Sequence, residues 1–173
     1  DDDALAEAAR CLRSHGMSGR NDHVLLGFNN RLSEIGGALG LVQLERLESL
    51  NAKRIANSET ILARVRRLSW AAVPVPERDI RHTYFWAPVA VPQESGRTIH
   101  DLKAHLDRWN IGYRHRYTEP LYRQPVFERL GYDFTDLHLP HVERIVGRVI
   151  GVPNHPNMSA DDVEQVCRAL EAF

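Results

Sequence analysis

The stretch Gly27–Gly40, "GFNNRLSEIGGALG", decides how the rest of the chain is interpreted. It opens with three polar side chains, Asn29, Asn30 and Arg31, and then enters a helical pattern with glycines at positions 36, 37 and 40. Each glycine costs a helix interior about 1 kcal/mol relative to alanine. Close approach by another helix or subunit would offset that cost, since a larger side chain would block it. The stretch therefore predicts an interface.

A long amphipathic helix is expected after this polar cluster. Ser33 is the best N-cap, Glu34 follows in the first turn, and the pattern runs to about Leu68. Its apolar positions fall mostly at three- and four-residue steps: Ile35, Leu39, Val42, Leu47, Leu50, Ile55, Ile61, Leu62 and Val65. About 35 helical residues span roughly 50 Å. Because that is too long for one small core, the helix should bridge two packing units or two subunits.

The flanking segments alternate between helical and extended patterns. Residues 1–16 predict a helix that stops at Gly16, and residues 17–27 predict a loop. After Pro74 and Pro76 the pattern predicts, in order, a strand at 82–91, a helix at 97–110 capped by Thr98, a strand at 111–117, a loop with one helical turn at 118–134, a helix at 139–149, a strand at 150–153 and a helix at 158–173 with a Ser159–Asp162 capping box. This order predicts a small mixed sheet with helices on one side, an α+β (mixed) fold.

Composition excludes several classes of protein. Of the 173 residues 43% are hydrophobic and 26% charged, which is typical of a globular protein. The net charge of −1 argues against a nucleic-acid or anionic-membrane partner, and no apolar run is long enough to span a membrane. Cys11 and Cys167 lie far apart in helical patterns, so we expect buried free thiols and a cytoplasmic location.

Several functional motifs fail on spacing. The closest histidine pair, His138 and His141, has no third ligand at a usual offset, so no metal site is expected. No G-x-S-x-G nucleophile elbow is present. The "GGALG" run lies inside a helical pattern and is not a phosphate loop between strand and helix.

The segment "RHRYTEPLYR" mixes three arginines with Tyr117 and Tyr122; the arginines are Arg114, Arg116 and Arg123. Basic and aromatic side chains together bind single-stranded nucleic acid in some proteins. They also form pockets for phosphorylated or sugar-like ligands, and a solvated loop without a ligand is a third interpretation. The near-neutral net charge favours the pocket.

The order of these segments resembles the C-terminal half of the DegT/StrS-type sugar aminotransferases. The matching pieces are "GFNNRLSEIGGALGLVQLERLE", "HTYFWAPVAV", "IGYRHRYTEPLYRQPVF" and "GVPNHPNMSADDVEQV". The resemblance implies the C-terminal small domain of the aspartate-aminotransferase fold (PLP transferase fold type I). Residues 1–32 would then be a remnant of the large-domain edge and interface loop, 33–68 the long interdomain helix, and 69–173 a small C-terminal α+β domain covered by helices.

The resemblance also implies roles for particular residues. Enzymes of this kind are usually homodimers, and Asn29 would reach the cofactor phosphate of the partner subunit through its neutral amide donor. A turn residue without a ligand is the alternative for Asn29. The substrate pocket would be lined by Arg31, Arg114, His115, Arg116, Tyr117 and Tyr122. The resembled family usually has histidines at the positions of Arg116 and Tyr122, which makes an aminocyclitol or an unusual amino sugar more plausible as the product.

Lysine is scarce in this chain. A transaminase holds the aldehyde of pyridoxal phosphate as a Schiff base on a lysine. The only lysines here are Lys53 and Lys103, in surface-like helical positions, and the resemblance puts the required lysine upstream. We therefore expect no catalytic residue here, and a chain that alone is inactive and binds cofactor weakly or not at all.

Three hypotheses follow from the missing lysine. The chain is part of an aminotransferase that passes an amino group from glutamate or glutamine to a keto-sugar (nucleotide sugar) or keto-cyclitol, as in antibiotic or polysaccharide biosynthesis. Alternatively, it is one piece of a split enzyme completed by a large-domain chain, or a non-catalytic binding or scaffold module. The start at Asp1, without a methionine, favours the first hypothesis.

Overall fold

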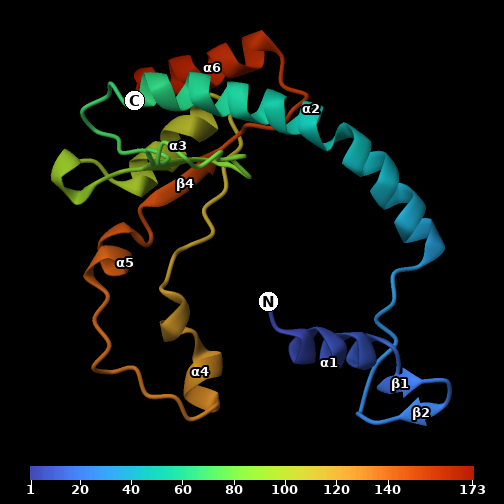
Figure 1. Ribbon diagram of the computed structural model, residues 1–173. Coiled ribbons are helices and arrows are strands. Elements are labelled where there is room, and N and C mark those ends of the chain that lie inside the picture. Colours follow the sequence, from blue (N-terminus) through green and yellow to red (C-terminus); the bar gives the residue numbers. More distant parts are fainter. The chain divides into compact units, whose positions relative to one another are not determined.

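The computed structural model describes every residue from Asp1 to Phe173. The chain divides into two compact units, unit 1 at Asp1–Leu47 and unit 2 at Glu48–Phe173. The boundary falls inside the long helix α2, Glu34–Val65, which the sequence predicted to bridge two packing units or two subunits. Figure 1 shows the elements of both units, and each unit is described by itself below.

Unit 1 contains α1 (Asp3–Arg13), the strands β1 (Met17–Gly19) and β2 (Asp22–His23), and the first turns of α2. The carboxylate of Asp2 caps α1 by accepting the N–H of Leu5 at 3.0 Å. The sequence predicted only a loop at 17–27, and the hairpin there is a correction. Strands this short show no detectable alternation of polar and apolar residues. The two-residue turn between them contains Asn21, which adopts φ 61°.

Two glycines fix the end of α1. Gly16 adopts φ 75°, and a Cβ added to it would lie 1.7 Å from the carbonyl oxygen of Leu25. A Cβ added to Gly27 would lie 1.9 Å from the nitrogen of Gly16. The predicted helix stop at Gly16 is confirmed, and the close backbone approach explains why both positions need glycine.

Unit 1 has almost no hydrophobic core. Every leucine, isoleucine, valine and phenylalanine side chain between Asp1 and Leu47 is exposed, and Leu26 and Ile35 are 90% and 85% exposed. The one buried apolar side chain is Cys11. Hydrophobic residues in such numbers normally face another protein surface.

Helix α2 begins where the sequence predicted. The hydroxyl of Ser33 accepts the N–H of Gly36 at 3.1 Å, so the predicted N-cap is confirmed. The helix ends at Val65 and not at Leu68, a difference within the usual fraying of helix ends. Its buried residues all lie in the last two turns: Ser58, Ile61, Leu62 and Val65.

Unit 2 is built on an antiparallel strand pair, β3 (Ala87–Ala90) and β4 (Val149–Val152). Single bridges from Ala72 to Ala90 and from Arg114 to Gly151 extend the pair at its two edges. The predicted mixed sheet is therefore wrong in direction, because each of these pairings is antiparallel.

Two predicted strands of unit 2 are shorter than expected. Residues 82–86 do not pair because Tyr84 has φ 48°, which breaks an extended backbone. Residues 111–117 make only the bridge at Arg114. Beyond it, the carbonyl of Tyr117 accepts the N–H of Gly147, so the chain contacts the turn before β4 instead of the strand itself.

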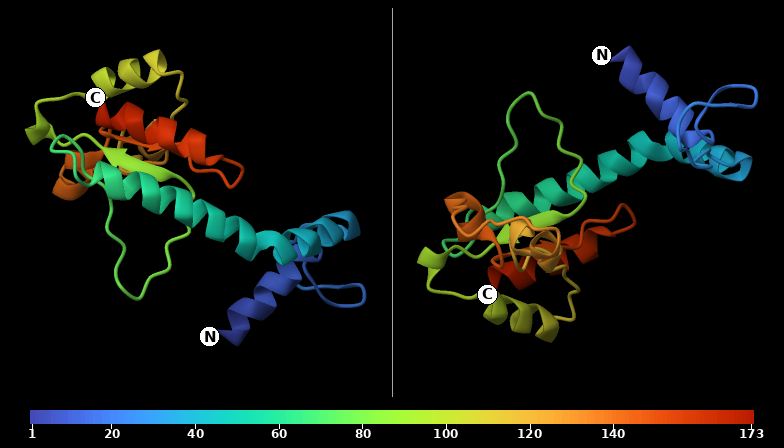
Figure 2. Two further views of the ribbon diagram at one scale, coloured as in Figure 1. Left: turned by 90° about the horizontal axis from the view of Figure 1, so that it is seen from above. Right: turned by 90° about the horizontal axis from the view of Figure 1, so that it is seen from below.

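Helices α3 (Ile99–Arg108) and α6 (Ala160–Glu171) begin at capping boxes, Thr98 with Asp101 and Ser159 with Asp162. The sequence predicted the Thr98 cap and the Ser159–Asp162 box, and both are confirmed. In Figure 2 (left), α6 lies between the C-terminal half of α2 and α3. Arg64 of α2 pairs with two glutamates of α6, Glu164 and Glu171. On its other side, the carbonyl of Ala169 bonds to the His105 ring of α3 at 2.8 Å. These contacts fix the helical layer.

The core of unit 2 lies between this helical layer and the strand pair. It joins apolar side chains from α2, β3, α3, β4 and α6: Ile61, Leu62, Val65, Val89, Leu102, Leu106, Ile150, Val166, Cys167 and Leu170, among others. Both cysteines of the chain are free and buried, as the sequence predicted. No helix is long and apolar enough to cross a membrane.

Short helices occupy the long connection between α3 and β4. They are η2 (Leu121–Arg123), α4 (Pro125–Arg129) and α5 (Pro140–Ile145); a further turn, η1 (Gln93–Ser95), follows β3. The predicted helix at 139–149 is correct in place but ends at Ile145, because Gly147 takes φ 74° and turns the chain into β4.

Candidate functional site

The polar cluster of unit 1 is held by backbone bonds to the end of α1. The N–H of Phe28 binds the carbonyl of Leu12 at 2.8 Å, and the N–H of Asn30 binds that of Arg13 at 2.9 Å. Asn29 forms an antiparallel bridge with Ser14. These bonds put the Asn29 and Arg31 side chains on a backbone with a defined position.

Hydrogen-bond donors dominate this cluster. The guanidinium Nε of Arg31 donates to the amide oxygen of Asn29 at 3.2 Å, which leaves the amide N–H groups of Asn29 available to another acceptor. A ring nitrogen of His15 lies 3.5 Å from Nη2 of Arg31. No carboxylate pairs with Arg31. An amide donor beside a guanidinium without a carboxylate partner suits a phosphate group.

In unit 2, Arg114 and Tyr117 both meet a pair of aromatic rings that precede β3. The Arg114 guanidinium lies 5.9 Å from the ring centre of Phe85, and the Tyr117 ring lies 5.5 Å from that of Trp86 in an edge-to-face arrangement. Both residues were predicted to line a substrate pocket, and Arg114 does line a pocket of about 470 Å³ with Phe85 and Trp86.

His115 and Arg116, which lie between Arg114 and Tyr117 in sequence, have different surroundings. The ring of His115 lies 3.2 Å from the carbonyl oxygen of Gly147, and Arg116 is exposed. The structure therefore brings two of the four residues at 114–117 to the aromatic pair.

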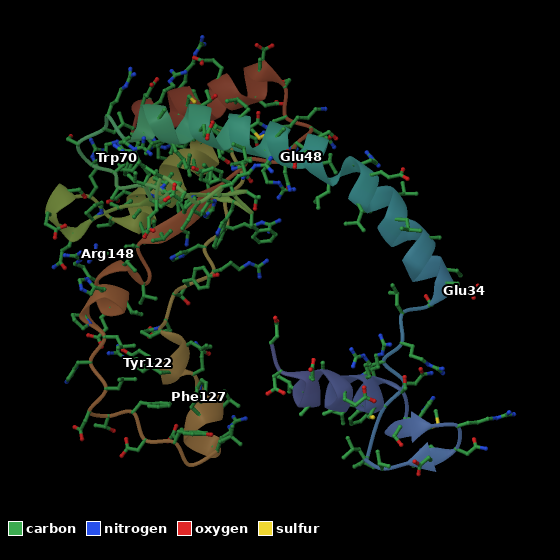
Figure 3. The ribbon with its side chains drawn as sticks, viewed as in Figure 1. Glu34, Glu48, Trp70, Tyr122, Phe127 and Arg148 are labelled. Carbon is green, nitrogen blue, oxygen red and sulfur yellow. The ribbon has the colours of Figure 1, made fainter.

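Tyr122 belongs to a separate cluster. Its hydroxyl donates to Glu143 at 2.7 Å, and its ring packs edge-to-face on Phe134. This hydrogen bond raises the pKa of Tyr122 and lowers the pKa of Glu143. Figure 3 shows Tyr122 and Phe127 along the connection between α3 and α5, away from Trp70 at the helix-covered part of unit 2. Tyr122 lines a different pocket from Arg114.

The sequence did not single out His15, Phe85 or Trp86. Each reaches its place through contacts between segments distant in sequence. His15 meets Arg31 because the 28–30 segment returns to the end of α1, and Trp86 meets Tyr117 across the strand pair. No local motif carries either signal.

The two lysines both lie in unit 2. Lys53 is exposed on α2, and the amine of Lys103 lies 5.9 Å from the ring centre of Tyr113. Unit 1 contains no lysine. No three histidine, cysteine, aspartate or glutamate side chains lie close enough to hold a metal ion.

The helix-covered α+β unit and the long helix match the aminotransferase fold over part of the length of solved structures. The model of the DegT/DnrJ/EryC1/StrS aminotransferase family matches residues 1–171, so the chain belongs to that family. The family depends on pyridoxal phosphate.

Relatives are similar to this chain along its whole length. The chain is 28% identical over 175 residues to a protein of Geobacillus stearothermophilus named "Pleiotropic regulatory protein", covering 100% of this chain and 45% of that one. The structure of DesV from S. venezuelae matches 99% of the chain with 26% identity and a TM-score of 0.86, over 44% of its own length. PseC of Helicobacter pylori matches 99% with 24% identity and a TM-score of 0.83, over 47% of its length. The chain thus spans a little under half of each relative.

Proposed function

We propose that this chain is the C-terminal part of an aminotransferase that transfers an amino group from glutamate or glutamine to a keto-sugar or keto-cyclitol. The observation that carries the proposal is the donor cluster of Asn29 and Arg31, on a unit whose apolar side chains face outward. Family membership supports the reaction class. Among the relatives, PseC is an aminotransferase involved in the biosynthesis of pseudoaminic acid, which supports a sugar-like ketone as the acceptor.

The residues present fit one end of the cofactor. Pyridoxal phosphate, when bound, supplies the aldehyde and electron-withdrawing ring that carry the amino group. Asn29 would donate its amide N–H to a phosphate oxygen. Arg31 would keep that amide oriented, because its Nε already holds the amide oxygen, and would add positive charge beside the phosphate.

The other end of the cofactor needs a lysine amine, and unit 1 has none. We place that lysine outside this chain, in the half of the relatives that the chain does not span. The exposed apolar face of unit 1 supports a covering surface, either in a homodimer formed through the Asn29 loop and α2 or from a complementary large-domain chain. Two buried free thiols support a cytoplasmic location.

The substrate would contact the arginine- and tyrosine-rich segment of unit 2. Arg114 and Tyr117 share the Phe85–Trp86 pair, which suits a ring-shaped ligand with an anionic group. Arg31, His115, Arg116 and Tyr122 remain proposed pocket residues. Tyr122 would meet a different part of the ligand, because it lines a separate pocket.

Amino transfer by the complete enzyme tests the proposal. Glutamate and a nucleotide-linked keto-sugar are supplied, and the aminated sugar and the retained cofactor are measured by mass spectrometry and absorbance. We expect Asn29→Ala to weaken cofactor binding about tenfold, as loss of a charge-assisted hydrogen bond does. Asn29→Asp should weaken it further by repelling the phosphate.

Asn30→Ala is the matched control, because Asn30 is the adjacent exposed amide and should leave cofactor binding unchanged. Full cofactor retention in Asn29→Asp would contradict the assigned role. Amino transfer by the 173-residue chain alone would contradict the placement of the lysine.

Two alternatives keep a specific observation in their favour. The absence of lysine from unit 1 also fits one piece of a split aminotransferase or a non-catalytic binding module, and one relative is named as a regulatory protein. Mixing the chain with a separately produced large domain distinguishes them. Restored amino transfer supports the aminotransferase piece, and a stable but inactive complex supports the binding module.

A further inference from the structure

Arg54 carries a buried nitrogen without a hydrogen-bond partner. Its Nε is the one buried side-chain nitrogen or oxygen in the chain that makes no hydrogen bond. On α2, the positions three and four residues away carry no carboxylate; they are Leu50, Asn51, Asn57 and Ser58. A buried N–H without an acceptor costs free energy, so this arginine is a position that the packing of the chain alone does not explain.

Arg54 faces the pocket of about 470 Å³ that Arg114 also lines. His155 adds a third basic group, and no aspartate or glutamate is among the lining residues. Arg114 is held in place because its backbone exchanges two hydrogen bonds with Gly151, at 2.9 and 2.8 Å. The two guanidinium groups therefore give the pocket positive charge without a carboxylate among the lining residues.

Aromatic rings form the wall of this pocket. Phe85, Trp86 and Tyr113 line it, and the indole of Trp86 packs directly on Gly151. A Cβ at Gly151 would lie 2.3 Å from the Trp86 ring, so only glycine admits the indole there. Such rings bind a flat or ring-shaped body beside the cations.

The backbone before these rings is strained. Tyr84 is buried with φ 48°, a rare value for a bulky residue. Asn154 holds it by donating to the Tyr84 carbonyl at 2.6 Å, and His82 accepts the Tyr84 N–H at 3.0 Å. This turn directs Phe85 and Trp86 to the pocket, and strain of this kind is concentrated at ligand sites.

We propose that the pocket between Arg54 and Arg114, walled by Phe85, Trp86 and Tyr113, binds a small organic anion, with its phosphate or carboxylate on the guanidinium groups and its ring against the indole. The two groups have the same chemistry at this site, since each offers paired oxygens to arginine. The site deepens the proposed function by locating the anionic end of a ligand. It rests on the proposed function for the kind of ligand, but its test measures binding and not amino transfer, so either can fail without the other.

Calorimetric titration of the full 173-residue chain tests the site. Each ligand is titrated into the chain at low salt. The binding of UMP is compared with that of uridine, its uncharged counterpart, and the binding of 2-oxoglutarate with that of its dimethyl ester. We expect saturable binding of at least one anion and none of its uncharged counterpart. Binding of UMP would identify phosphate as the group that the site recognises, and binding of 2-oxoglutarate would identify carboxylate.

Variants assign the binding to this pocket. Arg54→Gln and Arg114→Gln should each weaken the anion about tenfold or more, and the double variant should abolish binding. Arg67→Gln removes the same charge from an exposed position outside the pocket and should change nothing. Because Arg114 is exposed and its side chain makes no hydrogen bond within the chain, Arg114→Gln tests the site even if Arg54→Gln disturbs folding. Equal affinity in Arg114→Gln and wild type, or no binding of either anion, would overturn the proposal.

Discussion

Units 1 and 2 differ in whether their hydrophobic side chains are buried. In unit 2, leucines such as Leu102 and Leu106 are fully buried between strands and helices. In unit 1 no leucine is buried. The contrast shows that unit 2 buries its own hydrophobic core, whereas unit 1 does not, and a surface from outside is proposed above to cover unit 1. The residues proposed to meet the cofactor phosphate, Asn29 and Arg31, lie in unit 1.

The largest expected effect comes from one substitution made in both units. Leu106→Ala empties a fully buried position and should destabilise unit 2 by about 2–5 kcal/mol. Leu39→Ala, at a helical position that is 62% exposed, should leave the stability of unit 2 unchanged. Urea unfolding followed by tryptophan fluorescence measures both, since all three tryptophans lie in unit 2. Equal losses in the two variants would remove the distinction between the units.

A second pair compares two asparagines. The buried amide of Asn154 donates to Ser58 at 2.9 Å and to the Tyr84 carbonyl, so Asn154→Ala should cost unit 2 about 1–3 kcal/mol. Asn29→Ala should cost unit 2 no stability but should weaken the cofactor in the complete enzyme. Unfolding curves and cofactor retention, measured on both variants, separate the two roles. A stability loss in Asn29→Ala as large as that of Asn154→Ala would make Asn29 a structural residue.

Glycines in α2 sharpen the interface interpretation. A Cβ at Gly40 would meet no atom within 4 Å, so within this chain nothing requires glycine there. Gly40→Ala should therefore raise helix stability in the isolated chain by about 0.4–1 kcal/mol, seen as increased helical circular dichroism. Gly37→Leu should disturb self-association of the complete enzyme before it disturbs unit 2, as sedimentation would show. Unchanged self-association in Gly37→Leu counts against an interface at these glycines.

Acid should affect unit 2 by a smaller amount. The Thr98 hydroxyl lowers the pKa of Asp101, and the backbone N–H of Ser159 lowers the pKa of Asp162. A carboxylate whose folded pKa is depressed adds stability above its unfolded pKa of about 4, and this stability is lost as pH falls through the folded value. The urea midpoint should therefore fall between pH 5 and pH 3.

The cap variants check the origin of this acid loss. Asp101→Asn and Asp162→Asn should each flatten the pH dependence, because asparagine does not titrate. Asp136→Asn, an exposed aspartate outside any cap, serves as the control. If Asp136→Asn flattens the dependence as much as the two cap variants do, the caps are not its source.

Local chemistry made much of the fold predictable. The Thr98 cap, the Ser159 capping box, the Ser33 cap and the Gly16 stop each depend on residues within four positions of one another, and all are confirmed. The strands were harder to predict. The strained turn at Tyr84 is held by Asn154, 70 residues away, so a pattern over residues 82–91 could not reveal that only Ala87–Ala90 pairs.

The candidate site was predictable only in part, for the same reason. Arg114 and Tyr117 were predicted together because they share one short basic and aromatic segment, and each contacts a ring of the Phe85–Trp86 pair. Arg54 was missed because its signal is a missing hydrogen bond, which exists only once α2 packs against the strand pair. The sequence grouped Tyr122 with the other pocket residues because they lie close together in sequence. In the structure Tyr122 lines a separate pocket.

Amide hydrogen exchange on the whole chain tests the central claim most directly, because it reports local stability along the backbone. The account predicts strong protection of β3, β4, α3, α6 and the last turns of α2. It predicts rapid exchange in α1 and in residues 34–47 of the same helix α2, which lack a core of their own. Protection of unit 1 equal to that of unit 2, in the chain without any added partner, would contradict the claim that unit 1 is ordered by a surface from outside.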